Sequence, residues 1–144
     1  MILVSACLLG EKCRYDGQGN HSDTVVNALE DREYLAVCPE VAGGLGIPRP
    51  PAELTGDRVI RADRTDVTHA FQAGVERCMD LVDQFAVTSA ILKARSPACG
   101  CGKIYNGHFN QTLIDGDGLL ARALKAHGIS CRTEEDLPAV QNDD

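Results

Sequence analysis

The sequence is poor in aromatic residues and in positive charge. It contains no tryptophan, three tyrosines and three phenylalanines, yet 44% of its 144 residues are hydrophobic, which is typical of a compact soluble domain rather than a disordered chain. Lys and Arg number 14 against 21 Asp and Glu, so the formal net charge is −7. An acidic chain without a basic stripe is poorly suited to long phosphate backbones, and we expect no bulk binding of nucleic acid.

Long apolar segments, internal repeats and linkers are also absent. No apolar run approaches the roughly 20 residues that span a bilayer, so we expect no membrane segment. The first residues, "MILVSACLLGEKC", lack the basic region of a signal peptide and are typical of a first strand. We therefore expect one domain over residues 1–144 in the cytoplasm, with a loose acidic tail from about residue 137.

Cysteine, in contrast, is abundant. An odd number of thiols cannot pair completely, and a reducing cytosol disfavours structural disulfides. The cysteine content therefore favours metal binding or thiol chemistry as the function. The seven positions are Cys7, Cys13, Cys38, Cys78, Cys99, Cys101 and Cys131.

Short apolar runs alternate with helical patterns along the chain, which is typical of an α/β fold. We expect a single domain in which a mostly parallel sheet is flanked by helices. The expected elements are strands at 2–5, 33–37, 85–92 and 129–131, a hairpin over 54–62, and helices that begin at 22–23, at 66 and at 118.

Three of the expected strands run directly into loops that carry a cysteine: Cys7, Cys38 and Cys99. If helices connect these strands, the strands are parallel and the three loops leave the same edge of the sheet. Open α/β sheets bind ligands in the crevice outside the carboxyl ends of their strands. Three thiols that are distant in sequence are therefore expected to converge at an active site on this edge.

Thiolates without a histidine cluster suit either zinc or an iron–sulfur centre. A closed zinc site needs a fourth ligand, for which Cys13 or Cys101 is available, and the chain would then be a zinc-binding interaction module. A cluster with three protein ligands would instead leave one iron open to a substrate. A third alternative is a thiol redox protein that uses Cys99 and Cys101. The residues alone leave all three open.

Two polar residues lie beside the expected thiol site. Glu40 follows Cys38 by two residues, and Ser96 precedes Cys99 by three. A carboxylate in a partly dry cleft is suited to act as a general acid or base, because burial raises its pKa. Ser96 could relay a proton or orient a water molecule.

Four motifs occur in order along the chain: "SACLLGEKCRYDG" (5–17), "CPEVAGGLGIPRPPAEL" (38–54), "DVTHAFQAG" (66–74) and "ILKARSPACG" (91–100). Together they resemble the DUF523 family, to which the thiouracil desulfidases belong. The resemblance covers nearly the whole chain. It implies a catalytic [4Fe-4S] cluster held by three cysteines, which correspond to Cys7, Cys38 and Cys99, with one open iron.

The same resemblance implies a non-redox reaction. The open iron would bind the sulfur of 2-thiouracil, 4-thiouracil or a 4-thiouridine derivative, and water would replace that sulfur to give a uracil derivative and hydrogen sulfide. Glu40 and Ser96 match the acid/base pair of the family.

The chain departs from the family pattern at Ala98, where a serine is usual. We expect no additional C-terminal domain of the kind found in relatives that act on tRNA. A free base, nucleoside or nucleotide is therefore the expected substrate, with Arg14, Arg49 and Lys93 as candidates to bind it. A homodimer is a possible assembly.

Overall fold

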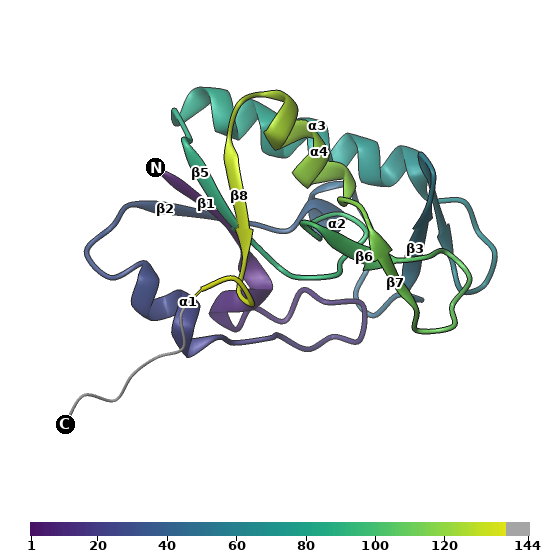
Figure 1. The fold of residues 1–144 in the computed structure, drawn as a ribbon. Helices are drawn as coiled ribbons and strands as arrows, with labels where there is room; N and C mark the ends of the chain where they lie inside the picture. The colour runs from purple at the N-terminus through teal and green to yellow at the C-terminus, as the bar shows by residue number, and fades with distance from the viewer. Residues whose placement is uncertain (138–144) are drawn as a thin grey trace.

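A four-stranded parallel sheet forms the centre of the molecule (Figure 1). The computed structural model describes residues 1–137. The strands pair in the order β2-β1-β5-β8, and every pair is parallel. The α/β fold with a mostly parallel sheet that the sequence predicts is confirmed. The four strands are β1 (Ile2–Ser5), β2 (Tyr34–Val37), β5 (Ser89–Leu92) and β8 (Ser130–Thr133).

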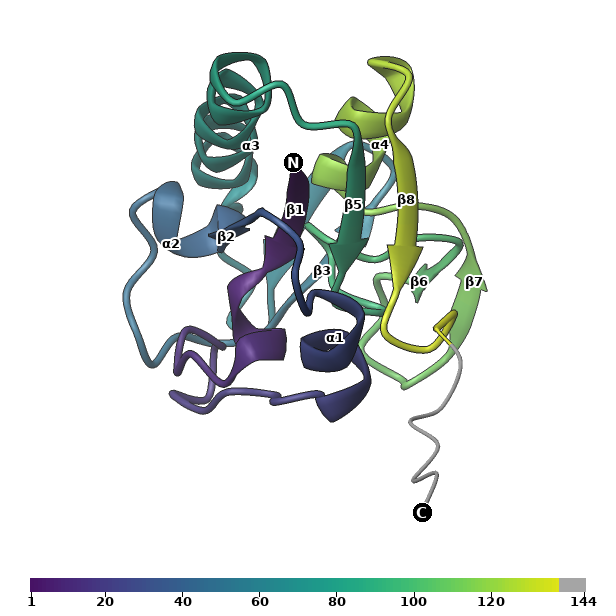
Figure 2. The same cartoon turned by 90° about the vertical axis from the view of Figure 1, so that its left-hand side faces the viewer.

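Helices cover both faces of this sheet. Figure 2 shows α1 (Asp23–Ala28) on one face, with α3 (Thr68–Gln84) and α4 (Leu119–Ala126) on the other. Successive residues of β1 point to opposite faces: Leu3 packs in the cluster with α3 and α4, whereas Val4 packs with α1. A strand buried on both faces reads as a continuous apolar run, which explains "ILV" at the start of the chain.

Ser22 caps its helix as predicted, whereas the N-cap of α3 is Val67, one residue after the predicted Asp66. One strand is also shorter than predicted. The Ser22 hydroxyl accepts the Val25 N–H at 3.3 Å, and the Asp66 carboxylate accepts the Thr68 N–H at 2.9 Å. The strand predicted over 85–92 begins only at Ser89. Phe85 is the C-terminal capping residue of α3. Ala86 has a positive φ of 52°, which lies in the left-handed region and outside the β region of strand residues.

Two antiparallel hairpins lie beside the main sheet. The predicted one is confirmed as β3 (Ala52–Thr55) and β4 (Arg58–Arg61). The other, β6 (Lys103–Tyr105) with β7 (Leu113–Asp115), is not among the elements that the sequence predicts. Strands of three residues are too short to show a periodic pattern.

A four-residue helix, α2 (Pro39–Ala42), follows β2 and packs directly on α3. Two glycines make this contact possible. A Cβ at Gly74 would overlap the carbonyl oxygen of Pro39, and one at Gly43 would overlap that of Ala70. The two backbones therefore touch, and this contact fixes the residues at the start of α2.

The end of the described chain returns to the centre of the molecule. Glu134 accepts the Ala94 N–H at 2.7 Å and pairs with Lys93 at 3.0 Å, and Leu137 is buried. The rest of the tail that was expected to be loose lies outside the described residues. Within residues 1–137, no helix combines the length and apolarity needed to cross a bilayer.

Candidate active site

A cavity of about 570 Å³ lies beyond the carboxyl ends of β1, β2 and β5. The chain leaves β1 toward β2 on one side, and β5 later pairs on the other side of β1. A sheet of this kind binds ligands where its strand order reverses. The cavity brings together every site residue that the sequence predicted: Cys7, Arg14, Cys38, Glu40, Arg49, Lys93, Ser96 and Cys99.

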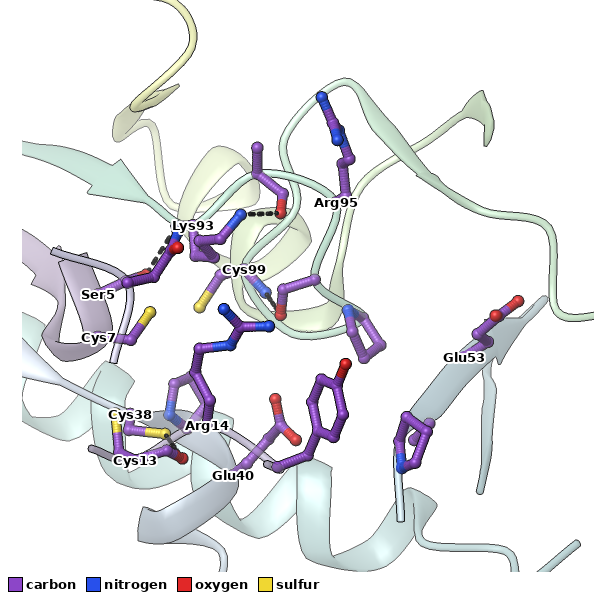
Figure 3. Close-up of a pocket in the computed structure, with 18 of the residues that line it drawn as sticks. Ser5, Cys7, Cys13, Arg14, Cys38, Glu40, Glu53, Lys93, Arg95 and Cys99 are labelled. Atoms are coloured by element: carbon purple, nitrogen blue, oxygen red, sulfur yellow. Dashed lines mark hydrogen bonds between the residues drawn. The ribbon is translucent and has the colours of Figure 1, made fainter. Parts of the chain in front are cut away.

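The three thiols predicted as ligands reach the cavity from three separate segments (Figure 3). Cys7 lies in a 3₁₀ turn, η1 (Ala6–Leu9), directly after β1. Cys38 lies between β2 and α2 and is the N-cap residue of α2. Cys99 follows β5 through a longer loop and is 5% exposed. Burial raises the pKa of the Cys99 thiol, against an opposing hydrogen bond with Ser5.

A fourth thiol, Cys13, also lines the cavity and is 6% exposed. The Cys38 thiol lies 3.8 Å from the Cys13 carbonyl oxygen. Contact with the Cys38 thiol lowers the pKa of Cys13, but contact with Cys7 and burial outweigh it and raise that pKa to about 11. The Cys13 contact and burial raise the pKa of Cys38. Sequence reasoning offered Cys13 as a fourth zinc ligand and left open whether it assists or replaces a cluster ligand. The structure places it against Cys7 and Cys38.

Glu40 lies in the first turn of α2 and is held by Arg49. The Arg49 Nε donates to a Glu40 carboxylate oxygen at 3.1 Å. Burial raises the pKa of Glu40, and Arg49 opposes that rise by charge and by hydrogen bonding. The carboxylate is thus desolvated yet oriented, which suits a group that exchanges protons with a ligand in the cavity.

Ser96 is oriented by the backbone of its own loop. Its Oγ accepts the Ala98 N–H at 3.1 Å and the Cys99 N–H at 3.0 Å. Since a hydroxyl oxygen has two lone pairs, both acceptor positions are occupied. The hydroxyl proton is left to donate to a group in the cavity.

The three cations predicted to bind substrate differ in their partners. The guanidinium of Arg49 is only 4% exposed and also donates to the carbonyls of Gly46 and Cys13, at 3.1 and 2.9 Å. Lys93 pairs with Glu134. Arg14 has the loosest pairing, 3.6 Å to Asp16, and points between the thiols and Glu40 in Figure 3. Arg14 is therefore the cation best placed to meet a ligand.

The donor set of the cavity suits a soft metal centre. Four thiols and no histidine line it, and thiolates are the ligands of zinc and of iron–sulfur clusters. Within the described residues, no group of three or more His, Cys, Asp or Glu side chains is arranged to hold one metal ion.

The other three cysteines do not line the cavity. Cys78 is 1% exposed within the core, on α3. The Cys101 thiol donates to the carbonyl oxygen of Cys131 at 3.5 Å. The side chain of Cys101 is thus engaged away from the cavity that Cys99 lines, which gives no support to a redox pair of these two.

Sequence reasoning missed the aromatic side of the cavity. Tyr15, Tyr105 and Phe109 line it, together with the buried carboxylate of Glu53. These residues come from loops and hairpins rather than from the ends of the main strands. The sequence offers one signal for the three aromatic residues: the chain has few aromatic side chains, so each one is a candidate for a specific role.

Known proteins are similar to this chain in both sequence and fold. A family model described as 2-thiouracil desulfurase matches residues 2–136. The uncharacterized protein YbbK of Bacillus subtilis (strain 168) is 35% identical over 147 residues, covering 95% of this chain and 97% of YbbK. The solved structure of the [4Fe-4S]-dependent thiouracil desulfidase TudS matches with a TM-score of 0.89 and 46% identity, over 95% of this chain and 92% of that one. The resemblance drawn from the sequence motifs is confirmed.

Proposed function

Because the chain belongs to the 2-thiouracil desulfurase family, it is an enzyme, and we propose that it removes sulfur from thiolated pyrimidines. The substrates are 2-thiouracil, 4-thiouracil or 4-thiouridine derivatives, and the products are the uracil derivative and hydrogen sulfide. Water supplies the oxygen and both protons of the sulfide, so the exchange is non-redox. The observation that supports this most is one cavity that combines four thiols with Glu40 and Ser96.

We propose Cys7, Cys38 and Cys99 as the ligands of a [4Fe-4S] cluster. The similar structure, TudS, is described as [4Fe-4S]-dependent. When bound, the cluster supplies an iron without a protein ligand, which polarises the carbon–sulfur bond as a Lewis acid. The thiolate-rich, histidine-free lining of the cavity fits such a group. Cys13 lies beside two of these ligands and is left as a neighbouring thiol.

Glu40 and Ser96 are the proposed catalytic pair. Glu40 takes a proton from the attacking water, and Arg49 keeps its carboxylate turned into the cavity. Ser96 donates its free hydroxyl proton to the substrate, because its oxygen already accepts two backbone N–H groups. Each residue therefore moves or holds one proton while water replaces sulfur.

The size and charge of the cavity favour a small substrate. A volume of about 570 Å³ lies within the range of small-molecule sites and accommodates a base or nucleoside. Of the three cations proposed to bind substrate, Arg14 contacts the polar edge of the pyrimidine ring or a phosphate of the substrate. Arg49 and Lys93 are paired with Glu40 and Glu134 and act mainly by holding these carboxylates in place. We further propose a cytoplasmic enzyme, in agreement with seven free cysteines. A homodimer is a candidate assembly, which light scattering tests.

Anaerobic reconstitution with iron and sulfide, followed by assays with 2-thiouracil and 4-thiouridine, tests the proposal. We expect about four irons per chain, release of hydrogen sulfide and stoichiometric formation of the uracil product. Glu40→Gln and Ser96→Ala should lower kcat by about a hundredfold or more with iron content unchanged. The exposed Glu30→Gln is the matched control and should behave like the parent protein.

Two results would refute this function. Colourless protein that holds one zinc per chain and no iron would favour the zinc-binding module. Protein with a full iron complement that releases no sulfide from any thiolated pyrimidine would exclude the proposed substrates.

A further inference from the structure

Glu53 is a buried carboxylate that the proposed reaction does not use. It lies in β3, is 9% exposed, and has no ion-pair partner among the described residues. One of its oxygens accepts the backbone N–H groups of Gly107 at 3.0 Å and of Phe109 at 3.2 Å. Both donors belong to the tip of the β6–β7 hairpin, residues 106–112. A buried carboxylate is costly unless hydrogen bonds compensate it, so these two bonds tie the tip to β3.

The tip is held in an unusual backbone conformation. Gly107, Phe109 and Gln111 have positive φ values of 91°, 53° and 59°. Such conformations are unfavourable for residues with side chains and persist where the surroundings impose them. A Cβ at Gly107 would overlap the hydroxyl of Thr55, so the tip also lies directly on β3. Glu53 and this close approach together hold the backbone from which the Phe109 side chain projects.

The tip presents Phe109 to the cavity rather than to the core. Phe109 lines the cavity, is 40% exposed, and belongs to neither hydrophobic cluster of the described chain. Tyr105, at the base of the same hairpin, and Tyr15 also line the cavity. Half of the chain's six Phe and Tyr residues thus surround one cavity, in a protein without tryptophan. Figure 3 shows Glu53 on the opposite side of this cavity from the labelled cysteines.

We propose that the β6–β7 tip is the wall against which the pyrimidine ring of the substrate lies. Phe109 contacts the face of the ring, and Glu53 is a positioning residue that acts through the backbone of the tip. This inference rests on the proposed function, because it takes a flat heteroaromatic ring as the ligand. Stacking of a base on an aromatic side chain is sequence-tolerant and depends on the ring face, so the wall serves free bases and nucleosides alike.

Binding of uracil, the product ring, to the reconstituted protein tests the wall without turnover. Phe109→Ala should weaken uracil binding in calorimetry about tenfold and raise KM for 2-thiouracil by a similar factor, with kcat and iron content nearly unchanged. Phe109→Tyr keeps the ring and should restore both values. Phe85→Ala is the matched control, because Phe85 is 41% exposed but does not line the cavity.

Variants of Glu53 test the positioning role. Glu53→Gln keeps an oxygen that accepts the same two N–H groups and should bind uracil normally. Glu53→Ala should weaken binding as much as Phe109→Ala, and the double variant should show no further loss. Should Glu53→Ala fail to fold, the Phe109 variants still test the wall.

The outcomes separate the inference from the function. If the protein is active and Phe109→Ala changes neither its uracil affinity nor its KM, the proposed ring-binding role of the β6–β7 tip is wrong and the proposed desulfidase activity is unaffected. If the protein releases no sulfide but binds uracil more weakly after Phe109→Ala, the proposed reaction is wrong and the ring-binding role of the tip is supported. Equal losses in Phe109→Ala and Phe85→Ala would show a general effect of removing an aromatic ring, and would also overturn the wall.

Discussion

The cysteines of this protein occupy two regions that differ in position rather than in burial. Cys7 and Cys99 at the cavity are 8% and 5% exposed, and Cys78 in the core is 1% exposed. Each is buried and free, yet only the first two follow the carboxyl end of a parallel strand. Burial alone therefore does not identify a ligand thiol, whereas its place at the edge of the sheet does.

The second region shows what a cysteine does as a packing residue. Cys101 and Cys131 are half-buried, pack against the main core cluster, and satisfy their thiols on backbone carbonyls. Burial raises the pKa of Cys131 to about 11, and the nearby Cys101 adds to that rise. Thiols of this kind behave as small apolar side chains. Substitutions in the two regions should consequently have very different effects on iron content.

The largest difference is expected for the cavity thiols. Cys38→Ser and Cys99→Ser should reduce iron from about four per chain to less than about one, because a thiolate ligand is lost in each. Cys13→Ser should retain most of the iron, and iron analysis with visible absorption measures all three. Loss of iron in Cys13→Ser together with retention in Cys99→Ser would replace Cys99 by Cys13 in the ligand set.

An intermediate effect is expected where the cavity meets the core. Gly74→Ala places a methyl group against the carbonyl of Pro39 and should push α2, with Cys38 and Glu40, away from α3. We expect a loss of about 3 kcal/mol in the free energy of unfolding, measured by denaturant titration of the apo protein, and a lower iron content after reconstitution.

Gly46→Ala is the matched control for this contact, since a Cβ at Gly46 meets no atom within 4 Å. It should change the free energy of unfolding by less than about 0.5 kcal/mol. Equal stability of the two variants would show that α2 and α3 are not in backbone contact.

The smallest effect is expected in the second region. Cys101→Ser keeps a donor for the Cys131 carbonyl and should leave iron content and sulfide release unchanged. The free energy of unfolding should fall by about 1 kcal/mol or less, because the serine is smaller and more polar in a half-buried position. A loss of iron comparable to that of Cys38→Ser would erase the distinction between the two regions.

Much of the fold and part of the site could be predicted from local patterns. The apolar runs predict β1, β2 and β5 of the main sheet, and Gly56 and Asp57 mark the turn of the first hairpin. The β6–β7 hairpin could not be predicted, because its strands have three residues each and its tip depends on Glu53, more than 50 residues earlier in the chain. The partnership of Glu40 and Arg49 likewise has no local signal.

Residue order alone determined that Cys7, Cys38 and Cys99 would meet at one edge of the sheet. The physical reason is that strands joined by crossover connections run parallel, and their carboxyl ends must then lie together. The tertiary structure decided what else enters that space: Cys13 beside two of the predicted ligands, Arg49 on Glu40, and two aromatic residues of the β6–β7 hairpin. These groups arrive through loops whose paths depend on packing against distant residues, and no periodicity in the chain records such a path.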